Sequence, residues 1–274
     1  MGEWPLILFT VLSQLVVGAV GTLWLLETLG KPLKGQAVKP LVGSLVIILG
    51  GGLLISLFHL GHPLLAFRAI TNLGSSWLSR EVLLFSITLV LLVLYYMKIS
   101  DAEPNGRKAM GGLASLVALL ALIASALVYT LPARSAWGNL YPTFFFIMTA
   151  AILGPLYVGL FLSRQEELPF NTAPLAGTAA LISGIGFILY LSLLLKGTPE
   201  SYQTALNLMG SASFWARAVL NWLLPAGILL AASLKKTKVN QSTLAALFLM
   251  VLIGEVLGRE LFYSATVALK VAGL

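Results

Sequence analysis

Eight long apolar runs dominate the chain, and each is long enough to cross a membrane as a helix. A transmembrane helix needs about 20 mainly apolar residues, because it must span a hydrocarbon core about 30 Å thick. The pattern predicts an all-α polytopic membrane protein with eight transmembrane helices, which could form two groups of four. The expected helices lie at about residues 5 to 28, 39 to 60, 80 to 98, 108 to 131, 141 to 163, 174 to 195, 213 to 234 and 244 to 270.

Turn-forming residues separate these runs. Glycine and proline gather in or beside the gaps, as in Gly30-Lys31-Pro32, Tyr141-Pro142 and Gly197-Thr198-Pro199. Hydrophobic residues make up 58% of the 274 residues and charged residues 10%, and the mean hydropathy is +0.95. Backbone polar groups find no water in lipid, so a continuous helix is the structure expected for each run. We expect one integral membrane domain over residues 1–274.

The loops differ in their content of lysine and arginine. One set of alternate loops holds ten of these residues and the other set holds six. Because the richer side normally stays in the cytoplasm, both termini are expected outside. No basic residue precedes the first run, which begins after Glu3 and Trp4, so we expect a retained helix there rather than a cleaved signal peptide.

Composition excludes several classes of redox centre. The protein has no cysteine, which excludes disulfides, thiolate-bound iron-sulfur clusters, c-type haem attachment and cysteine-bound zinc within it. The net charge of +7 comes largely from short loops between apolar runs, where topology signals are expected, so we do not expect nucleic-acid binding. Any such metal centre is expected in a partner protein.

Ionisable groups gather where the second expected helix ends and the third begins. His59 and His62 are the only histidines, and Glu81 enters the next apolar run. Because such groups are costly in a membrane, they are candidates for proton-coupled chemistry. Two histidines three residues apart on one helix cannot clamp both faces of a haem, which excludes a di-haem cytochrome but leaves His–Met ligation open. A neutral His59 could instead take a proton from a phenolic hydroxyl, with Glu81 relaying it, as a quinol site requires.

A second set of polar residues lies in the last two expected helices. Arg217 opens the seventh, and Glu255 and Arg259 are four residues apart on the eighth, so they share a face. They could form a structural ion pair to a neighbouring helix or part of a proton or ligand pathway. Gln14 near the middle of the first helix is interpreted as a packing hydrogen bond that could also reach a quinone headgroup. Gly254 and Gly258 have the spacing of close helix packing.

Several of these segments carry a family resemblance. Residues 59–81, HLGHPLLAFRAITNLGSSWLSRE, resemble the characteristic stretch of the membrane-anchor subunit of dimethyl sulfoxide reductase, the DmsC family. His62 stands where that family is expected to carry a small polar residue, and its role is not assigned. Further likeness lies in Glu3-Trp4-Pro5-Leu6, Gly154-Pro155-Leu156, Gly254-Glu255, Gly258-Arg259 and Phe262-Tyr263, so the resemblance covers essentially the whole protein.

The resemblance implies an anchor in the cytoplasmic (inner) membrane of a prokaryote that takes part in anaerobic respiration. Such a subunit binds menaquinol or another quinol, oxidises it without a haem or metal of its own, and passes electrons to an iron-sulfur subunit. That subunit feeds a molybdopterin catalytic subunit, which makes a heterotrimer. The resemblance places the quinol next to His59 and Glu81, which we expect to take up its protons, and we add Gln14, Arg68 and Arg80 as candidate quinol-binding residues. Arg68 and Arg80 could equally be interfacial anchors.

Two other functions stay open at this stage. A secondary transporter would also have many helices and a few buried charges, and Gly50-Gly51-Gly52 could interrupt the second helix as transporters require. Polar residues concentrated near one interface argue against it. A purely structural membrane tether would assemble with its partners but bind no quinol.

Overall fold

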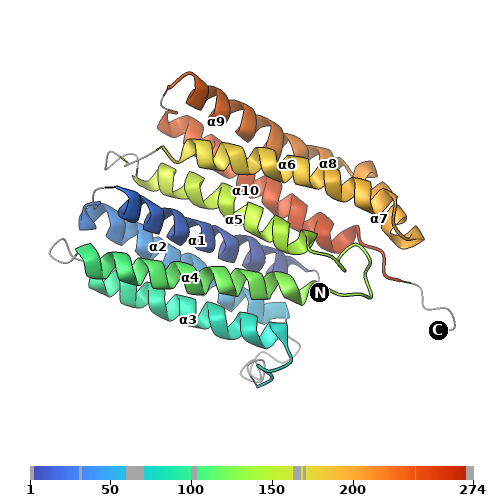
Figure 1. Cartoon of the computed structure of the whole chain (residues 1–274), viewed down its shortest axis with the longest axis horizontal. Coiled ribbons are helices and arrows are strands. Elements are labelled where there is room, and N and C mark those ends of the chain that lie inside the picture. The colour runs from blue at the N-terminus through green and yellow to red at the C-terminus, as the bar shows by residue number, and fades with distance from the viewer. Residues whose placement is uncertain are drawn as a thin grey trace.

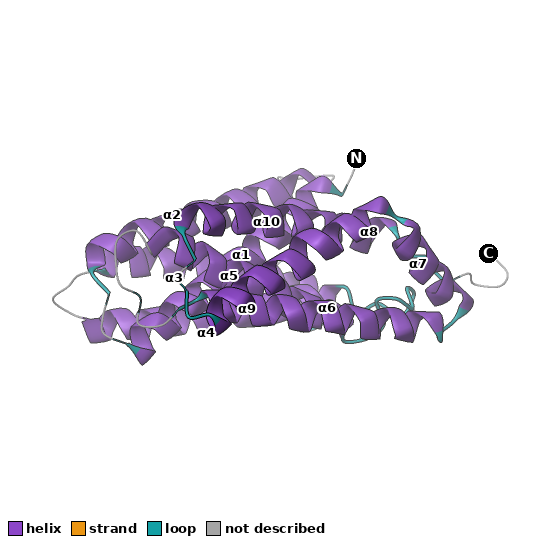
Figure 2. Ribbon diagram, turned by 90° about the horizontal axis from the view of Figure 1, so that it is seen from above, coloured by secondary structure: helices purple, strands orange, loops and turns teal. Residues whose placement is uncertain are grey.

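The computed structural model is a bundle of helices that run back and forth along one long axis (Figure 1). It describes residues 3–30, 33–59, 71–99, 104–162, 168, 171–237 and 239–269. Within these residues only helices, turns and loops occur, as Figure 2 shows from above. The predicted all-α class is therefore confirmed.

Each expected run forms helical structure close to its predicted place. The helices are α1 (Trp4–Leu29), α2 (Gly35–Ser56), α3 (Trp77–Lys98), α4 (Pro104–Val128), α5 (Tyr141–Leu162), α6 (Ala173–Leu195), α7 (Pro199–Gly210), α8 (Ala212–Arg217), α9 (Leu224–Leu234) and α10 (Gln241–Ser264). A 3-10 turn, η1 (Leu57–His59), extends α2, and a π-helical segment, η3 (Ala218–Leu223), joins α8 to α9. We call the end where α1, α3 and α5 begin the N-terminal end of the bundle, and the other the opposite end (Figure 1).

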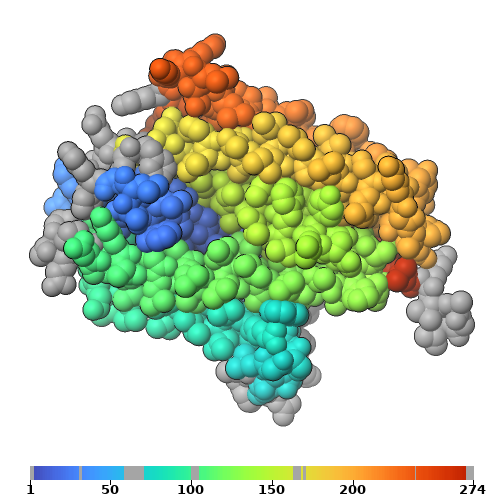
Figure 3. Space-filling model, viewed as in Figure 1, coloured from blue at the N-terminus to red at the C-terminus, as the bar shows by residue number. Residues whose placement is uncertain are grey.

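Side-chain caps fix where several helices begin. Ser76 accepts a hydrogen bond from the backbone N–H of Ser79 at the start of α3, and Asn240 accepts one from Thr243 at the start of α10. Such caps satisfy N–H groups that have no partner within the helix. Figure 3 shows the start of α3, in cyan, projecting from the side of the bundle, and residues 71–75 before it are exposed.

Among the described residues, seven helical segments are long and apolar enough to cross a membrane. They are α1 to α6 and the combined segment from Ala212 to Leu234. Large apolar side chains such as Ile47, Leu54 and Ile188 are 64% to 75% exposed on their outer faces, as expected for contact with lipid. The eighth expected span corresponds to α10, which carries Glu255, Arg259 and Glu260 and is not among the seven.

α1 lies at the centre of the bundle, where it packs against α2, α4, α5 and α10. Its crossing with α5 depends on Gly18 and Gly154, because a Cβ on either would overlap the backbone of the other helix. This close approach places α1 between α2 to α4 on one side and α5 to α10 on the other (Figure 1). The packing is continuous from α1 into α5, so the expected grouping into two sets of four is not established.

Three local features differ from the sequence-based expectation. α7 is an additional helix between the sixth and seventh spans; its polar residues and 12-residue length gave no apolar run of membrane length. The seventh span contains the π-helical segment η3 rather than a uniform α-helix. α2 continues without a break through Gly50, Gly51 and Gly52, so the glycine triplet does not interrupt the helix as a transporter would require.

Candidate functional site

Glu81 is a buried carboxylate in the first turns of α3, near the N-terminal end of the bundle. Its side chain is 5% exposed, and the described ion pairs do not involve it. One helical turn further along the same face, Phe85 is fully buried and meets the ring of Phe9 on α1 edge-on, with 5.5 Å between centroids. Glu81 therefore faces the interior of the bundle rather than lipid.

The hydroxyl group of Ser125 on α4 lies beside the Glu81 carboxylate, although it does not reach full hydrogen-bond geometry with it. Ser125 is itself buried, at 1% exposure. Tyr129 follows Ser125 by four residues, and its hydroxyl lies 2.6 Å from the Tyr263 hydroxyl at the end of α10. Burial raises the pKa of Tyr129, in the loop after α4, well above its ordinary value, so this hydroxyl stays neutral. The carboxylate and the hydroxyl pair thus share one end of the bundle.

The other predicted polar residues lie deeper in the same half, in two hydrogen-bonded groups around Glu255 and Arg259. Glu255 accepts a hydrogen bond from Asn221 at 2.7 Å, lies 2.9 Å from the Thr149 hydroxyl, and faces the Arg217 guanidinium at 3.7 Å. We call the set Gln14, Thr149, Arg217, Asn221, Glu255 and Arg259 the N-terminal-half network.

Arg259 makes different contacts from those expected. Its guanidinium donates to Gln14 on α1 at 2.8 Å and lies 3.9 Å from the ring centroid of Phe146. The ion pair to a neighbouring helix that the sequence allowed is formed by Glu255 with Arg217 of α8, whereas no ion pair joins Glu255 and Arg259 among the described residues. Both carboxylate oxygens of Glu255 have partners on other helices: Asn221 contacts one, and Thr149 and Arg217 contact the other.

Gly254 and Gly258 have a specific packing role. A Cβ at Gly258 would overlap the guanidinium of Arg217, and one at Gly254 would lie 3.0 Å from the Cβ of Asn221. The predicted close packing is therefore confirmed, and it makes room for polar side chains of α8 and η3 beside Glu255. A bulkier residue at Gly258 would displace Arg217 from the carboxylate.

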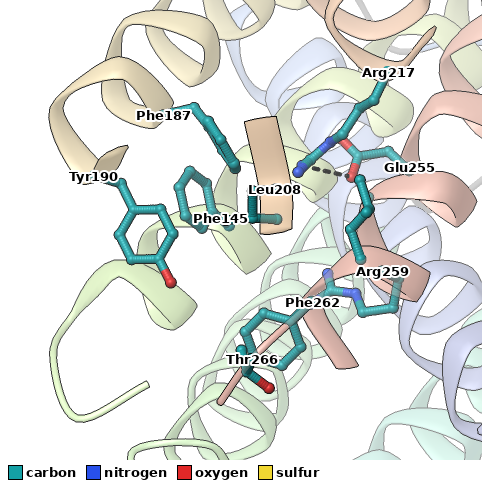
Figure 4. A pocket seen from close by; sticks show the side chains of 11 residues that line it. Phe145, Phe187, Tyr190, Leu208, Arg217, Glu255, Arg259, Phe262 and Thr266 are labelled. Carbon is teal, nitrogen blue, oxygen red and sulfur yellow. Dashed lines mark ion pairs between the residues drawn. The ribbon is translucent and has the colours of Figure 1, made fainter. Parts of the chain in front are cut away.

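Figure 4 shows a small cavity beside this network, with Arg217, Glu255 and Arg259 along one side and the rings of Phe145, Phe187 and Tyr190 along the other. The cavity measures about 30 Å³, far below the roughly 300 Å³ of the smallest usual ligand pockets. Of the side chains that line it, Arg217 and Arg259 each have a buried Nε without a hydrogen-bond partner among the described residues. Such a space suits ordered water better than a quinone ring.

A larger cavity of about 300 Å³ opens at the N-terminal end, and we call it the end cavity. Tyr263 and Trp137 form part of its wall. Its other lining residues include Glu3, Trp4, Arg134 and Glu260. Arg134 is fixed there by a 2.8 Å hydrogen bond to the Thr266 hydroxyl and by stacking over Trp137 at 4.7 Å.

The opposite end holds a second polar cluster that the sequence analysis missed. Glu27 on α1 forms a 2.8 Å ion pair with Arg107 on α4 and accepts a 2.8 Å hydrogen bond from Tyr95 on α3. Arg107 also donates to the Leu33 carbonyl at 2.6 Å and is 1% exposed. We call Glu27, Tyr95 and Arg107 the opposite-end cluster. The sequence analysis treated Arg107 only as one of the loop cations that set the topology. Glu27, an acid near the end of an apolar helix, was the signal that could have indicated a buried ion pair here.

The remaining predicted site residues lie partly outside the described residues. The backbone of His59 ends η1 next to α2, whereas its side chain, His62 and Arg68 fall outside the described part. Arg80 donates to the carbonyls of Leu73 and Gly74 at 2.8 and 2.7 Å, and its guanidinium covers the Trp77 ring. Within the described residues, His, Asp and Glu form no group of three that could hold a metal.

Comparisons with known proteins cover nearly the whole sequence. A family model described as DMSO reductase anchor subunit (DmsC) matches residues 1–265. The anaerobic dimethyl sulfoxide reductase subunit YnfH of Escherichia coli (strain K12) is 30% identical, over 99% of this protein and 98% of its own length. The C subunit of the anaerobic dimethyl sulfoxide reductase from the same organism is 27% identical, over 98% of each. Protein NrfD of Escherichia coli is 27% identical over 67% of this protein and 55% of its own length.

Proposed function

Because the chain belongs to the DMSO reductase anchor subunit family, we propose that it oxidises quinol for a membrane-bound molybdopterin oxidoreductase. The family resemblance noted in the sequence is confirmed, and with it membership of an oxidoreductase complex. We propose further that menaquinol or another quinol is the electron donor. An iron-sulfur subunit would receive the electrons and pass them to the molybdopterin subunit, in a heterotrimer at the prokaryotic cytoplasmic membrane.

The observation that carries this proposal is the buried Glu81 carboxylate at the N-terminal end of the bundle. An ionised carboxylate in an apolar interior is costly unless it is paired, and the described ion pairs leave Glu81 out. A group of this kind is suited to accept a proton during a reaction. The backbone of α2 and η1 leads to His59 at the same end of the bundle.

In the proposed reaction, the quinol enters from lipid and its hydroxyl groups approach His59 and Glu81. Each electron leaves to the iron-sulfur subunit as the quinol O–H bond breaks, and the proton passes to the imidazole or the carboxylate. With both termini outside, as the loop charges predict, these protons are released to the outer side. Arg68, Arg80 and Gln14 stay candidates for contacts with the quinol, and no haem is needed in this subunit.

The test is a comparison of electron donors in the assembled complex. His59→Ala or Glu81→Gln should lower turnover driven by a water-soluble naphthoquinol by about 100-fold or more, since general acid–base groups contribute on that order. Turnover driven by an artificial dye that feeds the catalytic subunits directly should stay unchanged. Unchanged quinol-driven turnover in both variants would reject the assignment and favour a purely structural tether.

The transporter alternative loses its strongest support in the structure. It relied on an interrupted second helix, and α2 is continuous through the glycine triplet. Purification under mild conditions separates the two functions directly. An anchor should retain an iron-sulfur protein and a molybdenum enzyme, whereas a transporter should retain neither.

A further inference from the structure

We propose that the hydroxyl pair of Tyr129 and Tyr263 carries protons from Glu81 to the end cavity, from which they leave the protein. This inference rests on the proposed function, because it describes how the protons of the oxidised quinol depart. It assigns a role to two residues that the sequence analysis did not consider for chemistry. The three parts of the route are the carboxylate, the hydroxyl pair and the cavity.

The first step leads from Glu81 to Tyr129 along α4. Ser125 lies beside the Glu81 carboxylate, and Tyr129 follows four residues later in the turn that ends the helix, where its N–H donates to the Ala126 carbonyl. Glu81 is close enough to affect the electrostatics of both tyrosine hydroxyls. The buried Ser125 hydroxyl has no hydrogen-bond partner among the described residues, so it is free to bond with a water molecule or with a protonated Glu81.

The second step is the hydrogen bond between the two tyrosines. Their oxygens are 2.6 Å apart, and either hydroxyl can be the donor. A phenolic hydroxyl both donates and accepts, so a proton can enter at one ring and another leave from the second. Both rings pack against neighbours edge-on: Tyr129 meets Trp137 with centroids 5.7 Å apart, and Tyr263 meets Phe262 with centroids 5.3 Å apart. The relay geometry is therefore held by packing.

The third step opens into the end cavity. Tyr263 belongs both to the hydroxyl pair and to the wall of this cavity, whose volume of about 300 Å³ has room for several water molecules. The carboxylates of Glu3 and Glu260 line the same space and offer proton acceptors next to the hydroxyl. The cavity lies at the N-terminal end, which the loop charges place outside the cell.

The surrounding charges favour release of the proton to the end cavity over its retention on the tyrosine pair. Arg259 acts electrostatically on both tyrosines from its place over Phe146, and Arg134 stands across the end cavity. These cations oppose a positive charge that rests on either hydroxyl, whereas Glu3 and Glu260 attract it outward. The titratable and charged groups that face the pair are thus Glu3, Glu81, Arg134, Arg259 and Glu260.

The proton balance of the route is simple. The quinol O–H bond breaks, its electron goes to the iron-sulfur subunit and its proton to Glu81. Protonated Glu81 then gives a proton to the oxygen of Tyr129, as the Tyr129 proton moves to Tyr263 and the Tyr263 proton moves to water in the end cavity. Both hydroxyls are restored, and one proton has moved outward.

The experiment removes each hydroxyl without its ring. In the whole complex, Tyr129→Phe and Tyr263→Phe should each slow naphthoquinol-driven turnover about tenfold or more, as loss of a proton-transfer group does. Dye-driven turnover and binding of a hydroxyquinoline N-oxide, as a quinol analogue, should stay unchanged. Because proton release then limits the rate, the solvent deuterium isotope effect should increase.

The matched control is Tyr157→Phe. Its hydroxyl donates a 2.8 Å hydrogen bond to Ser44 between α5 and α2, so it also loses one interhelical bond, but away from the route. Its quinol-driven turnover should stay within about twofold of the unmodified complex, because one neutral hydrogen bond contributes only about 1 kcal/mol. If the control slows as much as the two relay variants, the relay is rejected.

A second variant covers the case in which the two tyrosine variants do not assemble. Ser264→Phe would fill the end cavity from its exposed side and leave both hydroxyls in place. Slower quinol turnover with a larger isotope effect supports the exit route, whereas full turnover in this variant rejects it.

The proposed function and the relay fail in different ways. If Glu81→Gln keeps quinol turnover, the quinol site itself is wrong. If Glu81→Gln abolishes turnover while both Tyr→Phe variants keep it, only the relay is wrong. Parallel loss of inhibitor binding in the Tyr→Phe variants also rejects the relay, because the tyrosines would then hold the quinol rather than move its protons.

Discussion

The two ends of the bundle each bury a glutamate, but they hold it differently. At the opposite end, Glu27 is paired with Arg107 and accepts a hydrogen bond from Tyr95. At the N-terminal end, Glu81 is beside Ser125 and has no part in the described ion pairs. Each end also borders a cavity of 300 to 390 Å³, so access to open space does not distinguish them.

The difference teaches which buried carboxylate can take part in chemistry. A carboxylate fixed by a guanidinium is held in its charged form, because protonation would leave the cation unpaired. A carboxylate without such a partner can gain and lose a proton at lower cost. Glu27 therefore fits a structural lock between α1 and α4, and Glu81 fits a proton acceptor.

A mainly apolar stretch of α1 separates the polar residues of the two ends. Along α1, the buried residues between Gln14 and Glu27 are apolar apart from Thr22, whose hydroxyl donates to the Gly18 carbonyl. Val16 and Val20 within this stretch are fully buried. No described hydrogen bond or ion pair joins the N-terminal-half network to the opposite-end cluster, so we expect substitutions in one to have little effect on the other.

The largest effect on stability is expected from breaking the opposite-end cluster. Arg107→Met leaves Glu27 buried without its cation, which should cost about 3 kcal/mol or more and lower the thermal melting temperature of the complex in detergent. Quinol-driven turnover per assembled complex should stay unchanged. A selective loss of quinol-driven turnover would contradict the structural role.

The double variant Glu27→Leu with Arg107→Met sharpens the same comparison. Replacing both members of a buried pair by apolar residues is often neutral or stabilising. The double variant should therefore melt above the Arg107→Met variant. A further decrease on adding Glu27→Leu would show that the carboxylate has another role.

A moderate effect is expected at Gly258. Gly258→Ala would push the Arg217 guanidinium away from Glu255, and overpacking of this kind costs about 1 to 3 kcal/mol. Melting temperature should fall, and quinol-driven turnover should fall only in proportion to the assembled complex. Gly227→Ala is the control, since nothing lies within 4 Å of its added Cβ.

The smallest effect is expected at Arg80. Its guanidinium donates to the Leu73 and Gly74 carbonyls, so Arg80→Ala removes support of the turn before α3 rather than a buried charge. We expect a change of about twofold to fivefold in the apparent KM for quinol, corresponding to about 1 kcal/mol. A loss as large as that of Glu81→Gln, measured in the same turnover assay, would show instead that Arg80 contacts the quinol.

The sequence predicted the helices well because membrane spans depend on length and hydropathy, both of which are local. Helix ends were less accurate: α2 begins at Gly35 rather than near residue 39, because Gln36 and Lys39 lowered the apolar signal but are compatible with a helix. The short helix α7 was not predicted, because its polar residues interrupt the apolar pattern on which the prediction of helices relied.

Side-chain partners could not be predicted in the same way. Gln14 and Arg259 were each singled out from sequence, yet their contact joins residues 245 positions apart. Glu255 and Arg259 were expected to share a face and reach a neighbouring helix, but their spacing could not show that Glu255 would contact Arg217 and Arg259 would contact Gln14. The pairing of Glu27 with Arg107 depends on how α1 and α4 pack, which a single sequence does not specify.

The most direct test compares the two buried glutamates by the same substitution. For Glu81→Gln and Glu27→Gln in the whole complex, the ratio of quinol-driven to dye-driven turnover would be measured at equal amounts of assembled protein. We predict that the ratio falls about 100-fold or more for Glu81→Gln and stays unchanged for Glu27→Gln. Equal ratios in the two variants, or a fall confined to Glu27→Gln, would contradict the assignment of proton transfer to Glu81.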